Sequence, residues 1–447
     1  MSSTNVSQLL PHSAGLLSWS SCGRYLGIAK DTRLSIRDAT LNMAVVQVYT
    51  CIDIISSVQW APSMDADGLV LCAMYKRALV QVFSVTDPTW QCKIAEGICG
   101  LIGAKWTPDT RHIITISDFR IHATVWSLVD ASKYVIRQPK LGTDGMTFSP
   151  DGSYLAVAER AECKDMLGIY DVASWEMVSH FDVASYDLVE VQWTTDGRAI
   201  CVRDTFLEYR LLFYAPDGAL LQCYEAYQHA LGVKSLSWSP TGQFLAVGSY
   251  DERVRILSHM HYKPVAELEH PSSIVATRAR PDPVMVYEEV TQGRSSKHLV
   301  FRAASLPHSV TIVQPDPMKE SPRLGVGAMA WNHDATLLAT RNDNMPHHIW
   351  IWTTQTMELH AVLVLTKHIK TFKWSPTSST LAFACANNRV CLWSSAGVTW
   401  IEVADEALAI LSLRWHPTDG RHLLALGKSD FCCLYFPDAI AAAAPTS

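Results

Sequence analysis

The feature that most limits how this chain can fold is a segment that recurs at intervals of 41 to 46 residues. In each copy an apolar residue stands two positions before an aromatic anchor, and a turn and an apolar run follow the anchor. The nine anchors are Trp19, Trp60, Trp106, Phe148, Trp193, Trp238, Trp331, Trp374 and Trp415. One interval, from Trp238 to Trp331, is 93 residues, or two periods. A four-stranded propeller blade takes about 40–45 residues, so this spacing predicts a β-propeller.

The copy around Trp238, SLSWSPTGQFLAVGSYDERVRIL, shows how one unit is built. Residues 235–238 alternate between apolar and small polar side chains, as a half-buried strand does. Pro240 and Gly242 have the backbone preferences of a tight turn. An apolar run at 244–248 and a shorter one at 254–257 then predict two more strands of an antiparallel meander. A sheet of this size cannot bury both faces alone, so each copy needs neighbours.

Nine copies predict an all-β chain forming one closed ring of about nine four-stranded blades over residues 5–437. Eight blades with one irregular blade, or two smaller rings, are the alternatives. The last copy has strands near 411–415, 422–427 and 431–436, so it is one strand short. Residues 5–10 precede the first anchor and can supply that strand, which would close the ring and remove exposed sheet edges. We expect residues 438–447 to be a disordered tail.

One region, residues 271–322, departs from the repeat and holds seven of the 21 prolines of the chain. Strand-like islands occur within it at 284–287, 298–301 and 309–313. One interpretation is a degenerate blade with a loop in its middle. The other is an insertion that leaves the ring and is held by a partner, since loops on a rigid scaffold often carry function.

Composition excludes several classes of function. A net charge of −6 and a pI near 6.3 argue against a nucleic-acid-binding body, which needs a basic excess. The sequence has neither 18 consecutive apolar residues nor a signal-peptide pattern, so we expect no membrane insertion and no secretion. None of the 12 cysteines forms a C-x-x-C pair, and most lie in apolar strands. An intracellular, reducing compartment fits this usage.

Motifs for catalysis or ligand binding are absent from the sequence. It contains no phosphate-binding G-x-x-x-x-G-K-[ST], no H-E-x-x-H, no G-x-S-x-G and no G-x-G-x-x-G after a strand. His347 and His348 are adjacent in a predicted strand and therefore point to opposite faces, which disfavours a shared metal. We expect no enzyme activity, no cofactor and no metal.

Two polar turns are the candidate partner-binding surface. Tyr75, Lys76 and Arg77 form the turn of the second copy, and the segment RNDNMPHH at 341–348 extends the equivalent turn of a later copy. Equivalent turns of different blades share one rim of a propeller, so we expect these turns to contribute to one surface. The alternative is an elaborated hairpin whose Asn and Asp side chains bond only to turn backbone. The candidate residues are Tyr75, Lys76, Arg77, Arg341, Asp343, Asn344 and His347.

The copies resemble WD40 repeats, in a degenerate form. The Gly-His dipeptide is absent, and the closing Trp-Asp is replaced by pairs such as Trp126-Ser127 and Trp352-Thr353. This puts the hydrogen-bond network of that family in doubt in most blades. At finer grain, LCAMYKRALVQVFS (71–84), AERAECKD (158–165) and LATRNDNMPHHIWIW (338–352) are similar to the WD-repeat protein eight family, the WD40 proteins of centrosomes and spindle poles.

This resemblance implies a non-catalytic adaptor in the cytoplasm and cytoskeleton, at the microtubule-organising centre. The implied partner is a coiled-coil spindle-anchoring protein, and the γ-tubulin complex and a minus-end-directed kinesin lie nearby. The complex would tether microtubule minus ends and support spindle or cilium assembly. The alternative is a propeller like those of translation initiation factors, which bind the ribosome. Such factors usually carry charged or helical extensions, which this chain lacks beyond its last copy.

Overall fold

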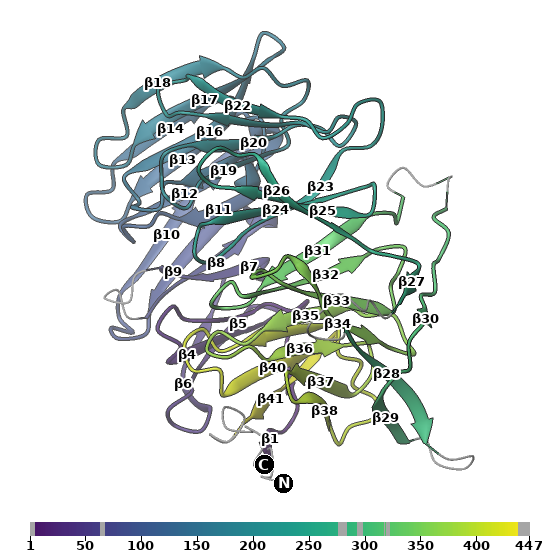
Figure 1. Cartoon of the computed structure of the whole chain (residues 1–447). Coiled ribbons are helices and arrows are strands. Elements are labelled where there is room, and N and C mark those ends of the chain that lie inside the picture. Colours follow the sequence, from purple (N-terminus) through teal and green to yellow (C-terminus); the bar gives the residue numbers. More distant parts are fainter. Residues whose placement is uncertain are drawn as a thin grey trace. The chain divides into compact units, whose positions relative to one another are not determined.

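A computed structural model describes residues 5–62, 68–275, 284–292, 298–316, 318 and 322–436, so the predicted tail at 438–447 lies outside the described residues. The chain divides into two compact units. The N-terminal unit comprises Pro11–Thr205 and Arg210–Ala226, and the C-terminal unit comprises Met1–Leu10, Phe206–Tyr209 and Tyr227–Ser447. The described residues form nine propeller-type blades, five in the N-terminal unit and four in the C-terminal unit (Figure 1).

The N-terminal unit contains blades 1 to 5, each an antiparallel meander paired in chain order. Blade 1 has strands β3 (Leu17–Trp19), β4 (Tyr25–Lys30), β5 (Arg33–Asp38) and β6 (Ala44–Thr50). Blade 2 has β7 (Ser57–Trp60), β8 (Leu69–Met74), β9 (Leu79–Ser84) and β10 (Gln91–Ala95). Blade 3 has β11 (Gly103–Trp106), β12 (His112–Ile116), β13 (His122–Ser127) and β14 (Lys133–Arg137). Blade 4 has β15 (Met146–Phe148), β16 (Tyr154–Ala161), β17 (Lys164–Asp171) and β18 (Met177–Asp182). Blade 5 has β19 (Glu190–Trp193), β20 (Ile200–Arg203), β21 (Leu211–Tyr214) and β22 (Leu220–Tyr224). Short 3-10 turns join some strands: η1 (Tyr75–Arg77), η2 (Gly97–Cys99), η3 (Asp118–Arg120) and η4 (Thr143–Gly145).

The C-terminal unit contains blades 6 to 9. Blade 6 has β23 (Val233–Trp238), β24 (Phe244–Ser249), β25 (Arg253–Ser258) and β26 (Pro264–Glu269). Blade 7 has β31 (Val326–Trp331), β32 (Leu337–Asn342), β33 (His348–Thr353) and β34 (Glu358–Val364). Blade 8 has β35 (Thr371–Trp374), β36 (Leu381–Ala384), β37 (Arg389–Ser394) and β38 (Gly397–Glu402). Blade 9 has β39 (Ser412–Trp415), β40 (His422–Leu426) and β41 (Asp430–Tyr435). Among the described residues, no helix is long and apolar enough to cross a bilayer.

The prediction that the N-terminus completes the last blade is confirmed. Strand β1 (Asn5–Val6) pairs antiparallel with β41, with Val6 opposite Leu434, and β2 (Leu10–Pro11) also pairs with β41. Ser7 continues the ladder, because its N–H donates to the Cys433 carbonyl at 2.9 Å and its hydroxyl accepts the Cys433 N–H at 2.8 Å. The edge of β41 that blade 9 would otherwise expose is therefore paired.

The hydrophobic core lies between neighbouring blades of the same unit. In blade 6 the second strand, β24, is buried along most of its length, whereas the last strand, β26, is mostly exposed. The β-branched and small residues of the middle strands suit burial on both faces. Core clusters join, for example, blades 4 and 5 in the N-terminal unit and blades 7 and 8 in the C-terminal unit. Within each unit, neighbouring blades thus bury part of one another's faces.

The anchor tryptophans also tie neighbouring blades together by hydrogen bonds. The Trp331 indole N–H donates at 3.0 Å to the carbonyl of Ser237, the residue just before the anchor of blade 6. Further anchors make the equivalent bond: Trp60 to Ser18, Trp106 to Gln59, Trp193 to Thr147, Trp374 to Ala330, and Trp415 to Lys373. The anchor must fill space between two blades and donate one hydrogen bond. Tryptophan does both, because it is large, apolar and has a single N–H donor, which explains why tryptophan marks most copies of the repeat.

Residues 271–322 add strands to an existing blade in their described part. Strands β28 (Met285–Gln292) and β29 (His298–Ala303) form an antiparallel hairpin, and β28 pairs in parallel with the outer strand β34 of blade 7 (Figure 1). Two of the predicted islands are thus strands. In the third, the strand is only β30 (His308–Ser309), which pairs with β27 (Ser273–Ile274). The described part forms no four-stranded sheet of its own.

Candidate functional site

The first predicted turn presents two cations. Tyr75, Lys76 and Arg77 form η1 between β8 and β9, and Ala78 takes the left-handed conformation (φ 52°) that ends it. Lys76 and Arg77 are exposed, while Tyr75 is half-buried. The Arg77 guanidinium lies 3.1 Å from a carboxylate oxygen of Asp53. The turn therefore offers an ammonium and a guanidinium to solvent, the latter paired with one acid.

The second predicted turn is held by contacts within the C-terminal unit. Asp343 accepts hydrogen bonds from the Lys234 ammonium at 2.7 Å and from Arg341 at 3.2 Å. Asn344 is buried, and its carbonyl accepts the N–H of Val313 at 2.7 Å.

His347 closes this second turn. Its Nδ1 lies 3.2 Å from the Leu365 carbonyl oxygen. Its ring lies edge-on to the ring of His368, with the two ring centroids 4.6 Å apart. The structure therefore brings Arg341 and Asp343 together and turns Asn344 inward. A shared rim with Tyr75–Arg77, and partner binding by either turn, stay predictions.

The hydrogen-bond network that the sequence put in doubt is present in blade 7. Trp352 donates its indole N–H to the Thr340 hydroxyl at 2.9 Å, and that hydroxyl lies 2.8 Å from Nε2 of His270. Nδ1 of His270 lies 2.7 Å from the Glu252 carbonyl, so Nδ1 carries the proton and Nε2 accepts from Thr340. Burial lowers the pKa of His270 to about 4. Sequence reasoning missed His270 because Glu, not Gly, precedes it.

Other blades build the same contact with different residues. In blade 3, Trp126 donates to Thr115 at 2.7 Å, and Glu96 bonds to both of them in the place of histidine. In blade 4, the Tyr170 hydroxyl donates at 2.7 Å to Glu159, which raises the pKa of the already desolvated phenol further. Degenerate repeats have therefore kept a buried polar link while changing its members.

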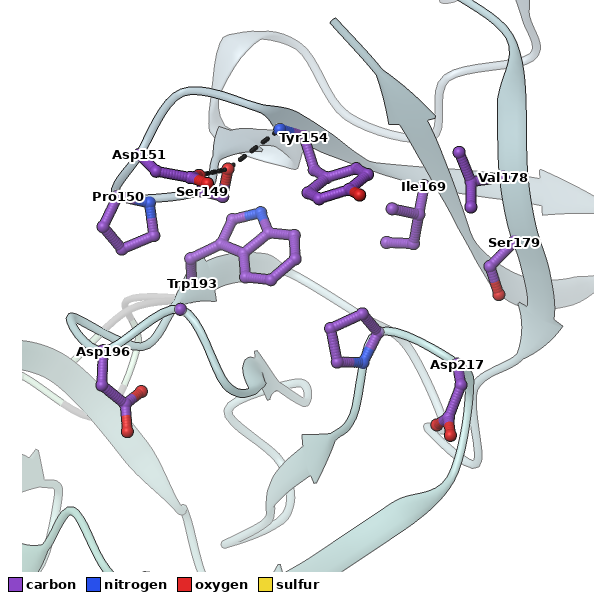
Figure 2. A pocket seen from close by; sticks show the side chains of 12 residues that line it. Ser149, Pro150, Asp151, Tyr154, Ile169, Val178, Ser179, Trp193, Asp196 and Asp217 are labelled. Atoms are coloured by element: carbon purple, nitrogen blue, oxygen red, sulfur yellow. Dashed lines mark hydrogen bonds between the residues drawn. The ribbon is translucent and has the colours of Figure 1, made fainter.

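A cavity of about 660 Å³ opens between blades 4 and 5 of the N-terminal unit. Its centre is the anchor Trp193, whose indole N–H is already bonded to the Thr147 carbonyl at 3.1 Å. Figure 2 shows this indole below the turn that runs from Ser149 to Tyr154. The other apolar lining residues are Pro150, Ile169, Val178 and Pro216. The wall is therefore mainly aromatic and aliphatic.

Three aspartates surround this cavity, each from a different turn: Asp151, Asp196 and Asp217 (Figure 2). All three are exposed. In each, Oδ1 accepts a backbone N–H two residues further on, at 2.9 to 3.1 Å, as aspartate commonly does in turns. Hydrogen bonds from Ser149 and Ser153 lower the pKa of Asp151. The charged residues that line the cavity are all acidic.

A second cavity of about 600 Å³ lies beside the first and shares Asp151 with it. It opens between blades 3 and 4 and has Asp109 and Asp171 in its wall, together with Arg111 and His112. Nδ1 of His112 bonds to Asp109 at 2.8 Å. The acidic surface at this side of the N-terminal unit thus continues over three blades.

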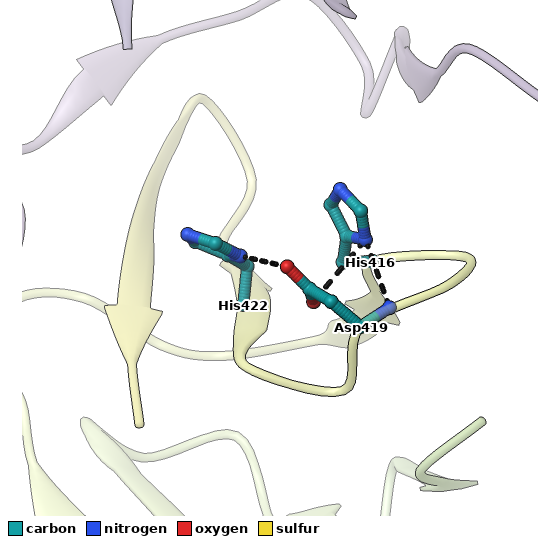
Figure 3. Close-up of side chains that lie close together, drawn as sticks. All are labelled: His416, Asp419 and His422. Atoms are coloured by element: carbon teal, nitrogen blue, oxygen red, sulfur yellow. Dashed lines mark hydrogen bonds and ion pairs between the residues drawn. The ribbon is translucent and has the colours of Figure 1, made fainter. Parts of the chain in front are cut away.

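A cluster of His416, Asp419 and His422 in blade 9 was missed by sequence reasoning (Figure 3). Asp419 lies between the two rings: its Oδ2 bonds to Nδ1 of His422 at 2.8 Å, and its Oδ1 lies 3.2 Å from Nδ1 of His416. Two imidazoles and a carboxylate are also zinc ligands. However, Nδ1 of His416 accepts the N–H groups of Thr418 and Asp419 at 3.3 Å.

This use of the His416 lone pair matches the role of Ser375 in blade 8, whose hydroxyl accepts the N–H of Thr377, also two residues further on, at 3.4 Å. Both residues directly follow the aromatic anchor of their blade. The cluster is therefore a hydrogen-bonded turn in which histidine replaces the usual hydroxyl. The signal in the sequence is the histidine in WHPTDGRH, where seven of the other copies have Ser, Thr or Asn and the second copy has Ala.

Comparison with known proteins agrees with this architecture. The family model "WD domain, G-beta repeat" matches residues 218–258 and 359–394. Mouse WD repeat-containing protein WRAP73 is 39% identical over 447 aligned residues, which cover 96% of each chain. A WD repeat-containing protein of Schizosaccharomyces pombe is 22% identical over 71% of this chain and 64% of its own length. The solved C-terminal WD40 domain of Sif2 matches with a TM-score of 0.51 and 12% identity over 86% of this chain and 96% of that one, and so supports the propeller fold.

Proposed function

We propose a scaffold function for this chain, which belongs to the WD-repeat protein eight family together with mouse WRAP73. The scaffold would act at the microtubule-organising centre, bind a coiled-coil anchoring protein and tether microtubule minus ends during spindle or cilium assembly. The observation that carries the proposal is the end-to-end similarity to WRAP73, because a match over 96% of both chains leaves the same blades available for the same contacts. The proposed cellular site is the cytoplasm and cytoskeleton.

The surface of the described residues suits protein binding. Turns that join rigid, buried strands hold their side chains in fixed places, which favours recognition with little loss of conformational entropy. Lys76 and Arg77 on η1 and the aspartates around Trp193 give two surfaces of opposite charge. Complementary charges speed association and align a partner. The chain would thus dock more than one segment at once, with no chemistry of its own.

The test is localisation together with quantitative capture. A fluorescent fusion of the full chain should concentrate with γ-tubulin at spindle poles, and its affinity capture should enrich a coiled-coil protein and γ-tubulin components over an unrelated WD40 propeller. Depletion of the chain should release microtubule minus ends from the poles. Diffuse localisation with enrichment of ribosomal subunits would contradict the proposal and favour the initiation-factor alternative.

A further inference from the structure

We propose that the cavity around Trp193 binds an arginine or lysine side chain from an extended basic segment of a partner protein. The proposal rests on the scaffold function above and adds the chemistry of one docking site. Three features support it: the wall of the cavity, its charges and the neighbouring cavity.

The wall fits the stem of a long basic side chain. Tyr154 and Val178, which are 39% and 62% exposed, form the accessible apolar wall, whereas Trp193 and Ile169 line the cavity but are buried. Because the only donor of the Trp193 indole is used by the Thr147 carbonyl, Trp193 offers the cavity no hydrogen bond, and the exposed aromatic ring of the lining is that of Tyr154. Methylene groups pack on such surfaces, and cations are attracted to aromatic faces.

The charges select the head group. Asp151, Asp196 and Asp217 each use Oδ1 as the acceptor of a turn N–H, and all three side chains remain exposed. Three exposed carboxylates on three turns, with no cation among the described residues that line the same cavity, attract a cationic ligand and repel phosphate. A guanidinium or ammonium inserted among them would gain partners for its N–H groups.

The neighbouring cavity shares Asp151 with the first and adds Asp109 and Asp171 from blades 3 and 4. Its described lining also holds one cation, Arg111, and His112, which bonds to Asp109 at 2.8 Å, so its carboxylates outnumber its cations three to one. An extended segment rises about 3.3 Å per residue, with alternate side chains on one side, so basic residues two or four apart can reach adjacent cavities. A segment with spaced basic residues therefore fits better than a single ion.

The experiment uses the full chain and a fluorescein-labelled probe peptide, GSRSRSRSGS, in which the Arg residues are two positions apart, and its binding is measured by fluorescence anisotropy at low salt. Three comparison peptides replace each Arg by Lys, by Gln or by Pro. We expect the Arg and Lys peptides to bind and the Gln peptide not to bind, with affinity falling as salt rises. Equal binding of the Gln peptide, or preferred binding of the Pro peptide, would overturn the proposal.

The variants are Asp196→Asn with Asp217→Asn, because Asn removes the charge and keeps the Oδ1 acceptor that each turn uses. An exposed ion pair changes a binding constant by a factor of about 1.4 to 5, so the double variant should bind about 2- to 25-fold more weakly. The matched control is Asp130→Asn, an exposed aspartate with the same turn bond to Ser132 but outside the cavity lining. Unchanged affinity in the double variant would refute the site.

Failure of this inference and failure of the scaffold proposal give different results. If the full chain concentrates at spindle poles but shows no charge-dependent binding of the Arg peptide, the cavity assignment is wrong and the scaffold stands. If the Arg peptide binds in the predicted way but the chain is absent from spindle poles, the scaffold proposal fails and the basic-peptide site stands.

Discussion

His270 predicts a specific dependence of stability on pH. This residue is 7% exposed, and its ring is neutral in the network with Thr340. The ring lies edge-on to those of Trp350 and Trp352, with centroids 5.3 and 5.5 Å apart. Burial lowers its pKa to about 4, against 6.5 when it is solvated. The unfolded chain therefore binds a proton at a higher pH than the folded chain does. Stability should fall as pH drops below 6.5 and level off below about 4.

The magnitude follows from the two pKa values. A difference of about 2.5 units corresponds to about 3 kcal/mol when titration is complete, and about 2 kcal/mol of it is lost between pH 7.5 and pH 5.0. His348, which is also buried with a pKa lowered to about 4, adds a loss in the same direction. The wild-type protein should therefore lose more stability over this range than His270 alone accounts for.

The assay is urea unfolding of the wild type and of His270→Gln at pH 7.5 and pH 5.0. The quantity compared is the change in unfolding free energy between the two pH values, because the substitution also removes hydrogen bonds at every pH. We expect this change to be about 2 kcal/mol smaller in His270→Gln. His261→Gln, at an exposed histidine next to blade 6, is the control. A His270→Gln variant with the full wild-type pH dependence would refute the buried neutral histidine.

Three further predictions test the repeat, the first turn and the histidine cluster. Trp331→Phe leaves the Ser237 carbonyl without its donor and should lower the free energy of unfolding by about 1–3 kcal/mol in urea titrations, whereas no change would show that packing alone ties the blades. The double variant Lys76→Glu, Arg77→Glu should weaken capture of the coiled-coil partner with unfolding changed by less than about 0.5 kcal/mol, because both side chains are exposed. Lys93→Glu, exposed on the same blade, should retain capture, and full retention by the double variant would remove this turn from the partner surface. His416→Ser should stay within about 1 kcal/mol of the wild type, and chelation by EDTA should leave the melting temperature unchanged, since a hydroxyl caps the equivalent turns. A melting temperature that rises with added zinc would contradict the hydrogen-bonded turn.

The repeat made the strands predictable because each blade is specified locally. An alternating strand, a Pro-Gly turn and an apolar run are all within about 15 residues of one anchor. The sequence also showed that blade 9 lacks a strand, which β1 supplies through Val6 opposite Leu434. The destination of six anchor indole N–H groups was not predictable, because each donates to a carbonyl of the preceding blade, over 40 residues away, as Trp374 does to Ala330.

The polar contacts were harder to predict for the same reason. His270 and Thr340 are 70 positions apart, so only the folded blade brings them to 2.8 Å. The cavity around Trp193 likewise joins turns at residues 149–152, 196–197 and 216–217, each of which reads as ordinary turn chemistry by itself. The acidic character of that surface follows from three turns meeting, and no single segment carries it.

The place of the insertion explains how blade 7 can carry extra strands without losing its own packing. His270 immediately precedes residues 271–322 and is hydrogen-bonded to Thr340 and to the Glu252 carbonyl. The first strand after the insertion, β31, is fixed by the hydrogen bond from the Trp331 indole to the Ser237 carbonyl. Both ends of the insertion are thus held by contacts that belong to the blades. The entropy of closing a loop grows only slowly with its length, so added residues between two fixed ends destabilise little.

The described strands of the insertion also connect two blades. Parallel pairing of β28 with β34 requires a long connection, and the chain between them includes β29 and the first three strands of blade 7. Glu289 on β28 then accepts the N–H of Thr366 at 3.0 Å and its hydroxyl at 2.7 Å, and Phe301 on β29 lies edge-on to Phe383 of blade 8 at 6.3 Å. The added hairpin is therefore fastened to two blades, and its far strand, β29, widens the C-terminal unit at the outer edge of blade 7.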